Sequence, residues 1–226
     1  MLANDLDGLT LRLDGAERRF AMAGRFNALN LAAAYAVGVA LGHEAGAVLD
    51  ALAAAPGVPG RFETVRAEGA LDGPAEGSVL GVVDYAHTPD ALDNVLATAR
   101  EIVPEGGRLW AVFGCGGDRD AGKRPQMAAV AEARADRVVL TSDNPRTEDA
   151  EAILDDVAAG LRRPEAAARI ADRAEAIRWA AAHAEAGDVV VVAGKGHETY
   201  QIVGTDRRHF DDREALREAL TPPTTS

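Results

Sequence analysis

The sequence predicts an α/β protein whose central sheet is mostly parallel, preceded by a short segment of a different domain. Four short runs of the chain are continuously apolar: Val79–Val83, Leu109–Phe113, Val138–Leu140 and Val189–Val192. Runs of this length and composition are typical of strands that are buried on both faces of a sheet. Segments with helical spacing separate them, and strands that alternate with helices form βαβ units around a parallel sheet.

Capping residues mark where several of the helices begin. Thr88 can cap a helix that has Pro89 at its first position. The apolar residues that follow keep helical spacing: Leu92, Val95, Leu96, Ala99 and Ile102. Asp172 and Asp211 each stand three residues before a glutamate, as in a capping box with Asp in place of Ser or Thr.

The first part of the chain follows a different pattern. Two short strands, Leu9–Leu13 and Arg18–Met22, are joined by the hairpin dipeptide Asp14-Gly15. The next segment, Asn30–Leu41, is apolar on almost every face, which is typical of a helix inside a larger protein. Only one more helix, His43–Ala54, follows it. Because a hairpin and two helices make a poor core, we interpret residues 1–58 as the remnant of a domain whose front half is missing.

The best domain boundary is the Pro/Gly linker Pro56–Gly60. We expect residues 59–220 to form a complete domain and residues 221–226 to be a disordered tail. We also expect an exposed apolar patch on the first segment, formed by residues that once packed against the missing part: Leu29, Leu31, Val37, Val39 and Leu41.

Composition and charge exclude several classes of function. The chain of 226 residues is 47% hydrophobic, which excludes wholesale disorder. It carries 24 basic and 36 acidic residues, a net charge of −12, which disfavours a nucleic-acid partner. A single cysteine, Cys115, fits a reducing compartment. The sequence contains neither a membrane-spanning apolar run nor a signal peptide, so we expect a cytoplasmic protein without a membrane partner.

Polar clusters follow all four predicted parallel strands: Asp84–Asp90, Gly114–Arg124, Thr141–Arg146 and Gly194–Glu198. Ligands of an open parallel sheet bind outside the carboxyl ends of its strands. We therefore expect these four clusters to meet at one edge of the sheet and to form the functional site.

Each cluster also has a structural interpretation. Asp84 could serve only to cap the next helix, and His87 alone is more often a structural histidine. The glycine-rich turn after Phe113 could be a simple tight turn; it lacks the Lys-Ser/Thr ending of a P-loop. Asp143–Pro145 could be an ordinary Asx turn. We interpret Cys115 as buried and structural, since no base stands in a pattern that would activate it.

The charged residues of these clusters favour a small zwitterion or anion over an apolar ligand. The cations alternate with acids along the clusters: Arg119, Lys123, Arg124, Arg146 and Lys195 with Asp118, Asp120, Asp143 and Glu198. Arginine offers a bidentate fork to a carboxylate, while carboxylates accept from an ammonium group. His197 and Glu198 lack metal-ligand spacing with any other pair, so we expect no metal site made by this chain alone.

Six motifs together resemble, in order and spacing, the Mur ligases of peptidoglycan synthesis: Gly24–Asn30, Gly60–Glu63, Asp84–Pro89, Gly114–Arg124, Asp143–Arg146 and Gly194–Glu198. The resemblance runs from about Gly8 to about Leu220, and Asp-Asn-Pro-Arg is the signature of the branch that adds meso-diaminopimelate. It implies the end of a central ATPase domain followed by a complete, Rossmann-like C-terminal domain. The motif G-x-x-x-x-G-K-[ST] of the family's P-loop does not occur in the sequence.

The resemblance also implies roles for individual residues. For ATP, it implies that Asn30 contacts the adenine, Arg61 the phosphates and Asp84 the ribose. Tyr85 and His87 would line the nucleotide pocket. Lys123 and Arg124 would lie in a loop facing the reacting phosphate, as the catalytic pair. The meso-diaminopimelate pocket would comprise Arg119, Asp143, Asn144, Arg146, Gly194 and Glu198. The Mg²⁺ ligands are expected in the missing part of the central domain.

The implied reaction joins meso-diaminopimelate to UDP-N-acetylmuramoyl-L-alanyl-D-glutamate at the expense of ATP. This chain alone is expected to be inactive, and the missing N-terminal part could exist as a separate chain. Two alternatives remain open at this point. One is a module that binds nucleotide or amino acid without chemistry. The other is a ligase of the folylpolyglutamate synthetase class, which would not explain Asp143–Arg146.

Overall fold

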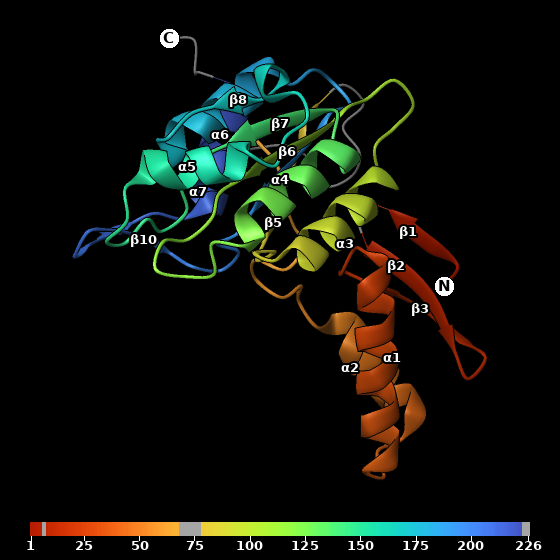
Figure 1. The fold of residues 1–226 in the computed structure, drawn as a ribbon. Coiled ribbons are helices and arrows are strands. Elements are labelled where there is room, and N and C mark those ends of the chain that lie inside the picture. Colours follow the sequence, from red (N-terminus) through yellow and green to blue (C-terminus); the bar gives the residue numbers. More distant parts are fainter. Residues whose placement is uncertain (6–7, 68–77, 223–226) are drawn as a thin grey trace.

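A computed structural model describes residues 1–5, 8–67 and 78–222, and Figure 1 shows its fold. A six-stranded sheet forms its centre, in the order β4-β5-β9-β6-β7-β8. Its strands are β4 (Glu63–Val65), β5 (Leu80–Asp84), β6 (Leu109–Phe113), β7 (Arg137–Leu140), β8 (Ala168–Arg169) and β9 (Val189–Ala193). All neighbours pair in parallel except β4, which runs antiparallel to β5. The four predicted strands and the mostly parallel sheet are confirmed.

Helices cover both faces of this sheet (Figure 1). On one face lie α3 (Pro89–Arg100), α4 (Lys123–Arg134) and α5 (Ala150–Ala158), packed on strand residues such as Val82 and Val191. On the other lie α6 (Arg173–His183) and α7 (Asp212–Leu220), packed on alternate residues such as Val83 and Val192. Because successive side chains of a strand point to opposite faces, apolar runs are what such a two-sided core requires.

The predicted helix caps are present. The Thr88 hydroxyl accepts a hydrogen bond from the Ala91 amide, and Pro89 is the first residue of α3. Asp172 accepts from the Glu175 amide at the start of α6. Asp211 also caps its helix, although it accepts from the amide of Arg213.

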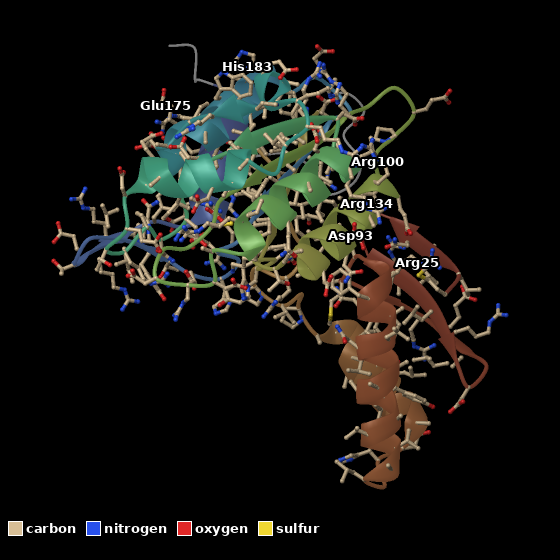
Figure 2. The ribbon with its side chains drawn as sticks, viewed as in Figure 1. Arg25, Asp93, Arg100, Arg134, Glu175 and His183 are labelled. Carbon is tan, nitrogen blue, oxygen red and sulfur yellow. The ribbon has the colours of Figure 1, made fainter. Side chains whose placement is uncertain are left out.

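One ion pair and one hydrogen bond join α3 to α4 on their solvent side. Figure 2 shows Asp93, Arg100 and Arg134 grouped on these two helices. Arg134 Nε and Nη2 lie 2.7 and 2.9 Å from the two carboxylate oxygens of Asp93, and Arg100 Nη2 donates to the carbonyl oxygen of Arg134. Arg25, also labelled in Figure 2, lies 3.3 Å from Glu101 and joins the first segment to the end of α3.

The first segment lies to one side of the sheet domain (Figure 1). The strands β1 (Ala3–Asp5), β2 (Gly8–Leu13) and β3 (Ala16–Phe20) form a sheet against α1 (Arg25–Ala40) and α2 (Ala45–Ala54). The predicted hairpin and both helices are confirmed, but α1 begins at Arg25, earlier than the apolar run indicated, and β1 was not predicted. A small core fills the space between the elements: Leu9, Leu11, Phe20, Leu31, Tyr35 and Leu49.

The predicted apolar patch is confirmed at four positions and wrong at one. The exposed side chains are Leu29, Val37, Val39 and Leu41, at 75%, 59%, 38% and 73% of their full accessibility. Leu31 is only 2% exposed, because it faces the small core under β2 and β3.

Besides β1, the strands β4 and β8, a short hairpin and a short 3-10 helix escaped the sequence analysis. A polar hairpin, β10 (Tyr200–Val203) and β11 (Asp206–His209), follows β9, and a short 3-10 helix spans Pro164–Ala166. Neither element contributes a buried apolar side chain, so neither has the pattern on which sequence analysis depends. Of the expected tail, residues 223–226 lie outside the described ones. No helix among the residues described is long and apolar enough to span a membrane.

Candidate functional site

The four polar clusters meet at the carboxyl edge of the parallel strands. The cluster after β9 joins the one after β5, since the Gly194 amide donates to the Asp84 carbonyl oxygen at 3.0 Å. The cluster after β6 joins the one after β7, where the Gly117 amide donates to the Asn144 carbonyl oxygen at 2.9 Å. The sheet order places β9 between β5 and β6, so Gly194–Glu198 lies at the middle of this edge.

One side of the site is a network of buried charged and polar groups. Lys195 Nζ lies 3.2 Å from Asp143 Oδ1, 3.0 Å from Asn144 Oδ1 and 2.8 Å from the Tyr200 carbonyl oxygen. The Asn144 side-chain amide donates to Glu198 Oε2 at 3.1 Å. Burial lowers the pKa of Lys195, and the Asp143 carboxylate opposes that effect. The network therefore brings together Asp143, Asn144 and Glu198, three of the residues predicted to bind the amino acid.

Beneath this network lies a buried ion pair that the sequence did not indicate as part of the site. Arg173 of α6 pairs with Asp212 of α7 through two contacts of 2.7 Å. Its remaining donors reach the carbonyl oxygens of Ser142 and Ala193, at the ends of β7 and β9. In the sequence, Arg173 and Asp212 indicated only the starts of two helices. Their pairing ties these helices to the strand ends that carry the site.

Arg146 occupies a strained position at the other side of the site. Its φ of +53° lies in the left-handed region, where a residue with a Cβ is uncommon. Nη1 donates to the Gly117 carbonyl oxygen at 2.7 Å. Nε and Nη2 meet no acceptor among the residues that the structure describes. The guanidinium thus keeps one edge open, which is the edge that binds a carboxylate in a bidentate manner.

Arg119 stands in the neighbouring loop and is exposed. Within the described part of the chain it forms no hydrogen bond or ion pair, whereas Asp118 beside it accepts from the Thr147 hydroxyl and amide. The Thr147 contacts lower the pKa of Asp118. Asp118 therefore fixes this loop against the segment after Arg146 and leaves the Arg119 side chain available.

Lys123 and Arg124 differ from each other in their surroundings. Both begin α4 instead of lying in the preceding loop, and Lys123 Nζ donates to the His87 carbonyl oxygen at 2.7 Å. Arg124 is 2% exposed and lies 2.8 Å from both Glu148 and Asp156. The contacts of Arg124 therefore join α4 to the segment that follows β7.

The residues predicted to contact nucleotide gather after β5. Asp84 accepts from the amides of Phe62 and Ala86, at 2.7 and 2.8 Å, and burial raises its pKa. The Arg61 guanidinium lies 4.7 Å from the centre of the Tyr85 ring. The rings of His87 and His197 flank Tyr85: their centroids are 4.8 and 5.4 Å from that of Tyr85. His197 was not predicted here and joins this group because it precedes Glu198 in the loop after β9.

Asn30 does not join that group through any hydrogen bond of the described chain. It is exposed on α1, and its side-chain amide donates to Asn27 Oδ1 at 3.2 Å.

The hairpin that follows β9 supplies contacts that the sequence analysis missed. The Gln201 side chain donates to the Asp143 carbonyl oxygen at 2.7 Å, and the Ile202 amide donates to Asn144 Oδ1 at 2.9 Å. The Arg146 amide donates to the Ile202 carbonyl oxygen. Four of the six groups in these three hydrogen bonds belong to the backbone, which sequence motifs do not report. Strand β10 thus fixes the segment from Asp143 to Arg146.

Cys115 is buried, as predicted, with its sulfur 3.6 Å from that of Met127. Burial raises the pKa of its thiol to about 12. The residues described contain no group of three or more His, Cys, Asp or Glu that could hold a metal ion.

Comparison with known proteins decides the family. Residues 60–196, more than half of the chain, match the family described as Mur ligase, glutamate ligase domain. The chain belongs to this family. The resemblance seen in the six motifs is therefore confirmed, and the Mur ligase match covers all four polar clusters except the end of the last one.

Curated Mur ligases resemble this chain over most of its length. It is 54% identical over 199 residues to the UDP-N-acetylmuramoyl-L-alanyl-D-glutamate–2,6-diaminopimelate ligase of Thermosynechococcus vestitus, covering 88% of the chain and 38% of that protein. It is 50% identical over 228 residues to the ligase of the same name from Chromobacterium violaceum, covering 97% of the chain and 44% of that protein. The chain thus spans about two fifths of the length of these relatives.

Solved structures show the same fold. A structure of a UDP-N-acetylmuramoyl-L-alanyl-D-glutamate–2,6-diaminopimelate ligase is 44% identical, with a TM-score of 0.68 over 96% of this chain and 43% of its own. Folylpolyglutamate synthase of Mycobacterium tuberculosis, solved with ADP and AMPPCP, has a TM-score of 0.62 at 24% identity, covering 84% of this chain and 43% of its own. At this low identity, the similarity to folylpolyglutamate synthase shows only that the two proteins share a fold.

Proposed function

We propose that this chain is the amino-acid-binding part of an ATP-dependent ligase that adds meso-diaminopimelate to UDP-N-acetylmuramoyl-L-alanyl-D-glutamate. The observation that carries the proposal is the open edge of the Arg146 guanidinium next to the network of Asp143, Asn144 and Glu198. A carboxylate suits the guanidinium, and an ammonium group suits the carboxylates. Relatives at about 50% identity carry the name of this ligase, which supports the proposal independently.

Meso-diaminopimelate has a carboxylate and an ammonium group at each end, so its distal end needs both kinds of partner at once. We assign the distal carboxylate to Arg146 with help from Arg119, and an ammonium group to Glu198 and Asp143. Gly194 is a buried residue with φ of +122° and no side chain, so it leaves the space beside the Asp143 carboxylate unfilled. Asn144 acts by orienting Glu198, since its side-chain oxygen already accepts from Lys195 and Ile202.

ATP supplies the phosphoryl group that activates the accepting carboxylate. The residues after β5 fit a nucleotide: the Tyr85 ring offers a stacking face, and the exposed Arg61 offers a cation over that ring. We assign the phosphates to Arg61, the ribose to Asp84, and the base to Asn30 and the pocket lined by Tyr85 and His87. Lys123, the first residue of α4, contacts this group at the His87 carbonyl oxygen and is placed to neutralise phosphate charge, while Arg124 holds α4 in position. Mg²⁺ ligands are assigned to parts of the ligase beyond this chain.

We further propose that residues 59–220 form one domain and residues 1–58 the end of the preceding one. The separate hydrophobic core of the first segment supports this division. The linker Pro56–Gly60 would join the two domains, and a complete ligase would bury the exposed side chains of α1 against residues outside this chain.

Calorimetry of the chain with single amino acids tests the proposed function. Meso-diaminopimelate should bind more tightly than L-lysine, which lacks the distal carboxylate and leaves Arg146 unpaired, or than L-glutamate, the substrate expected of a folylpolyglutamate synthetase. A site built for a polar group can reject an analogue that lacks it by up to about 10⁴-fold, less where the site is exposed. Arg146→Ala should lose the preference, and Arg178→Ala, which removes an exposed arginine on the far side of α6, should keep it. Equal binding of the three amino acids would reject the proposal.

A further inference from the structure

Lys195 is the most completely buried cation of the site, with no accessible surface. Only two of the 24 basic residues in this arginine-rich chain are lysines, and both, Lys123 and Lys195, lie in the site. Nζ has Asp143, Asn144 and the Tyr200 carbonyl around it within 3.2 Å, and Glu198 Oε2 at 4.0 Å. Such a space fits the compact ammonium group of lysine better than a planar guanidinium.

The charges around Lys195 come from four elements. Asp143 follows β7, Glu198 follows β9, Arg173 belongs to α6 and Asp212 to α7. Arg173 and Asp212 compensate each other through their two short contacts. Lys195 therefore faces two carboxylates, those of Asp143 and Glu198, and can compensate only one of them.

One carboxylate oxygen of the pocket depends on the charge of Lys195. Asp143 Oδ1 is buried and has no hydrogen bond in the described structure. Lys195 Nζ lies 3.2 Å from it as an ion pair, but its hydrogen bonds go to Asn144 and to the Tyr200 carbonyl. Buried polar atoms almost always have partners, so the charge of Lys195 is what stabilises this buried oxygen as part of a carboxylate.

We propose that Lys195 is the positioning residue that keeps both Asp143 and Glu198 ionised and leaves the pocket with one uncompensated negative charge, the complement of a single substrate ammonium group. This inference rests on the proposed function. Without Lys195, two carboxylates would share a buried pocket, and one of them would take up a proton at neutral pH. Binding of an ammonium group would then have to expel that proton.

Proton exchange on binding of meso-diaminopimelate tests the proposal, measured by calorimetry in buffers of different ionisation enthalpy. The unmodified chain should bind with no net proton exchange between pH 6 and 8. Binding of meso-diaminopimelate to Lys195→Met should release up to one proton per ligand. The affinity of this variant for meso-diaminopimelate should rise about tenfold per pH unit in this range. The double variant Lys195→Met/Asp143→Asn restores the charge balance, so its proton release should disappear. Proton release by the unmodified chain, or uniformly weaker binding by Lys195→Met without proton release, would overturn the proposal.

Stability measurements on the chain without ligand distinguish a failure of this inference from a failure of the proposed function. If meso-diaminopimelate does not bind at all, the proposed function fails, yet the charge balance remains measurable. The shared proton raises a carboxylate pKa in folded Lys195→Met above its unfolded value, so the stability of this variant should fall, relative to the unmodified chain, as the pH rises from 5 to 8. The double variant should not show this fall, and it should fold at neutral pH even if Lys195→Met does not. Parallel stability curves, or a double variant that also fails to fold, would count against the inference.

Discussion

Gly60 and Gly196 meet backbone to backbone: a Cβ placed on Gly60 would lie 2.1 Å from the carbonyl carbon of Gly196. Both residues have positive φ values, +65° and +53°. Their contact places the linker against the loop after β9, and Arg61, the residue that follows the linker, lies over Tyr85. The contact therefore joins the end of the linker to the loop that carries Lys195 and Glu198.

Gly60→Ala should be far more harmful than Gly204→Ala. Both glycines have nearly the same φ, +65° and +60°, so both variants incur the left-handed penalty of about 1–2 kcal/mol. A Cβ on Gly204 meets nothing within 4 Å, whereas a Cβ on Gly60 collides with Gly196. Thermal unfolding of the two variants measures the difference. Equal destabilisation would show that the linker does not rest on this loop.

Removal of Arg173 should destabilise the chain strongly. Arg173→Met leaves Asp212 buried and uncompensated, for which we expect a loss of about 3–5 kcal/mol in the free energy of unfolding. Arg173→Met/Asp212→Asn should recover part of that loss. The control is Arg208→Met, whose ion pair with Asp206 is exposed and worth about 1 kcal/mol or less. Denaturant titration of all three variants measures their free energies of unfolding. A loss for Arg173→Met no larger than that for Arg208→Met would refute the prediction.

Cys115 should be inert in the folded chain. Its pKa of about 12 lies far above neutral pH, so almost no reactive thiolate exists at pH 8. A coloured thiol reagent should therefore react with Cys115 only after denaturant is added. Reactivity should rise with pH towards 12 as long as the fold persists. Rapid labelling of the native chain at pH 8 would contradict both the burial and the raised pKa.

The exposed apolar side chains of α1 should cause the chain to associate. Leu29 and Leu41 are about three quarters exposed, and Leu29 also lines an open groove of about 480 Å³ beside β2. Light scattering should show association that Leu29→Ser/Leu41→Ser reduces, as should a chain that begins near Val58. Val203→Ser, at an exposed apolar side chain on the distant hairpin, should have no effect. A clean monomer of the unmodified chain would disprove this expectation.

The 226 residues alone should release no phosphate from ATP in the presence of meso-diaminopimelate and the UDP-sugar dipeptide. Phosphoryl transfer needs backbone donors, a lysine and Mg²⁺ around the γ-phosphate, and the loss of one strong electrostatic element typically costs about 3–4 kcal/mol of barrier lowering. The sequence has no G-x-x-x-x-G-K-[ST] motif to supply them. A fragment that carries a P-loop should restore some release when added. Steady turnover by the chain unaided would contradict the expectation.

The sequence by itself determined the four buried parallel strands, the helix caps and the residue types of the site. Runs such as Val189–Val192 are buried on both faces, and that burial leaves a continuous apolar pattern. Asp172 and Thr88 each accept from the amide three residues further along the chain, so their capping roles are visible locally. The polar clusters were also visible, because in a parallel sheet each one directly follows its strand.

Only the tertiary structure decided which of these residues face a ligand and which support them. Arg124 and Arg146 belong to equally polar clusters, yet the buried Arg124 is paired with two carboxylates and Arg146 keeps an open edge. The partners responsible lie 24 and 32 residues away from Arg124 in the chain. Arg173 and Asp212, 39 residues apart, became neighbours only through the packing of α6 on α7. The charge of a buried group depends on partners that the fold brings together, and local sequence spacing carries no record of them.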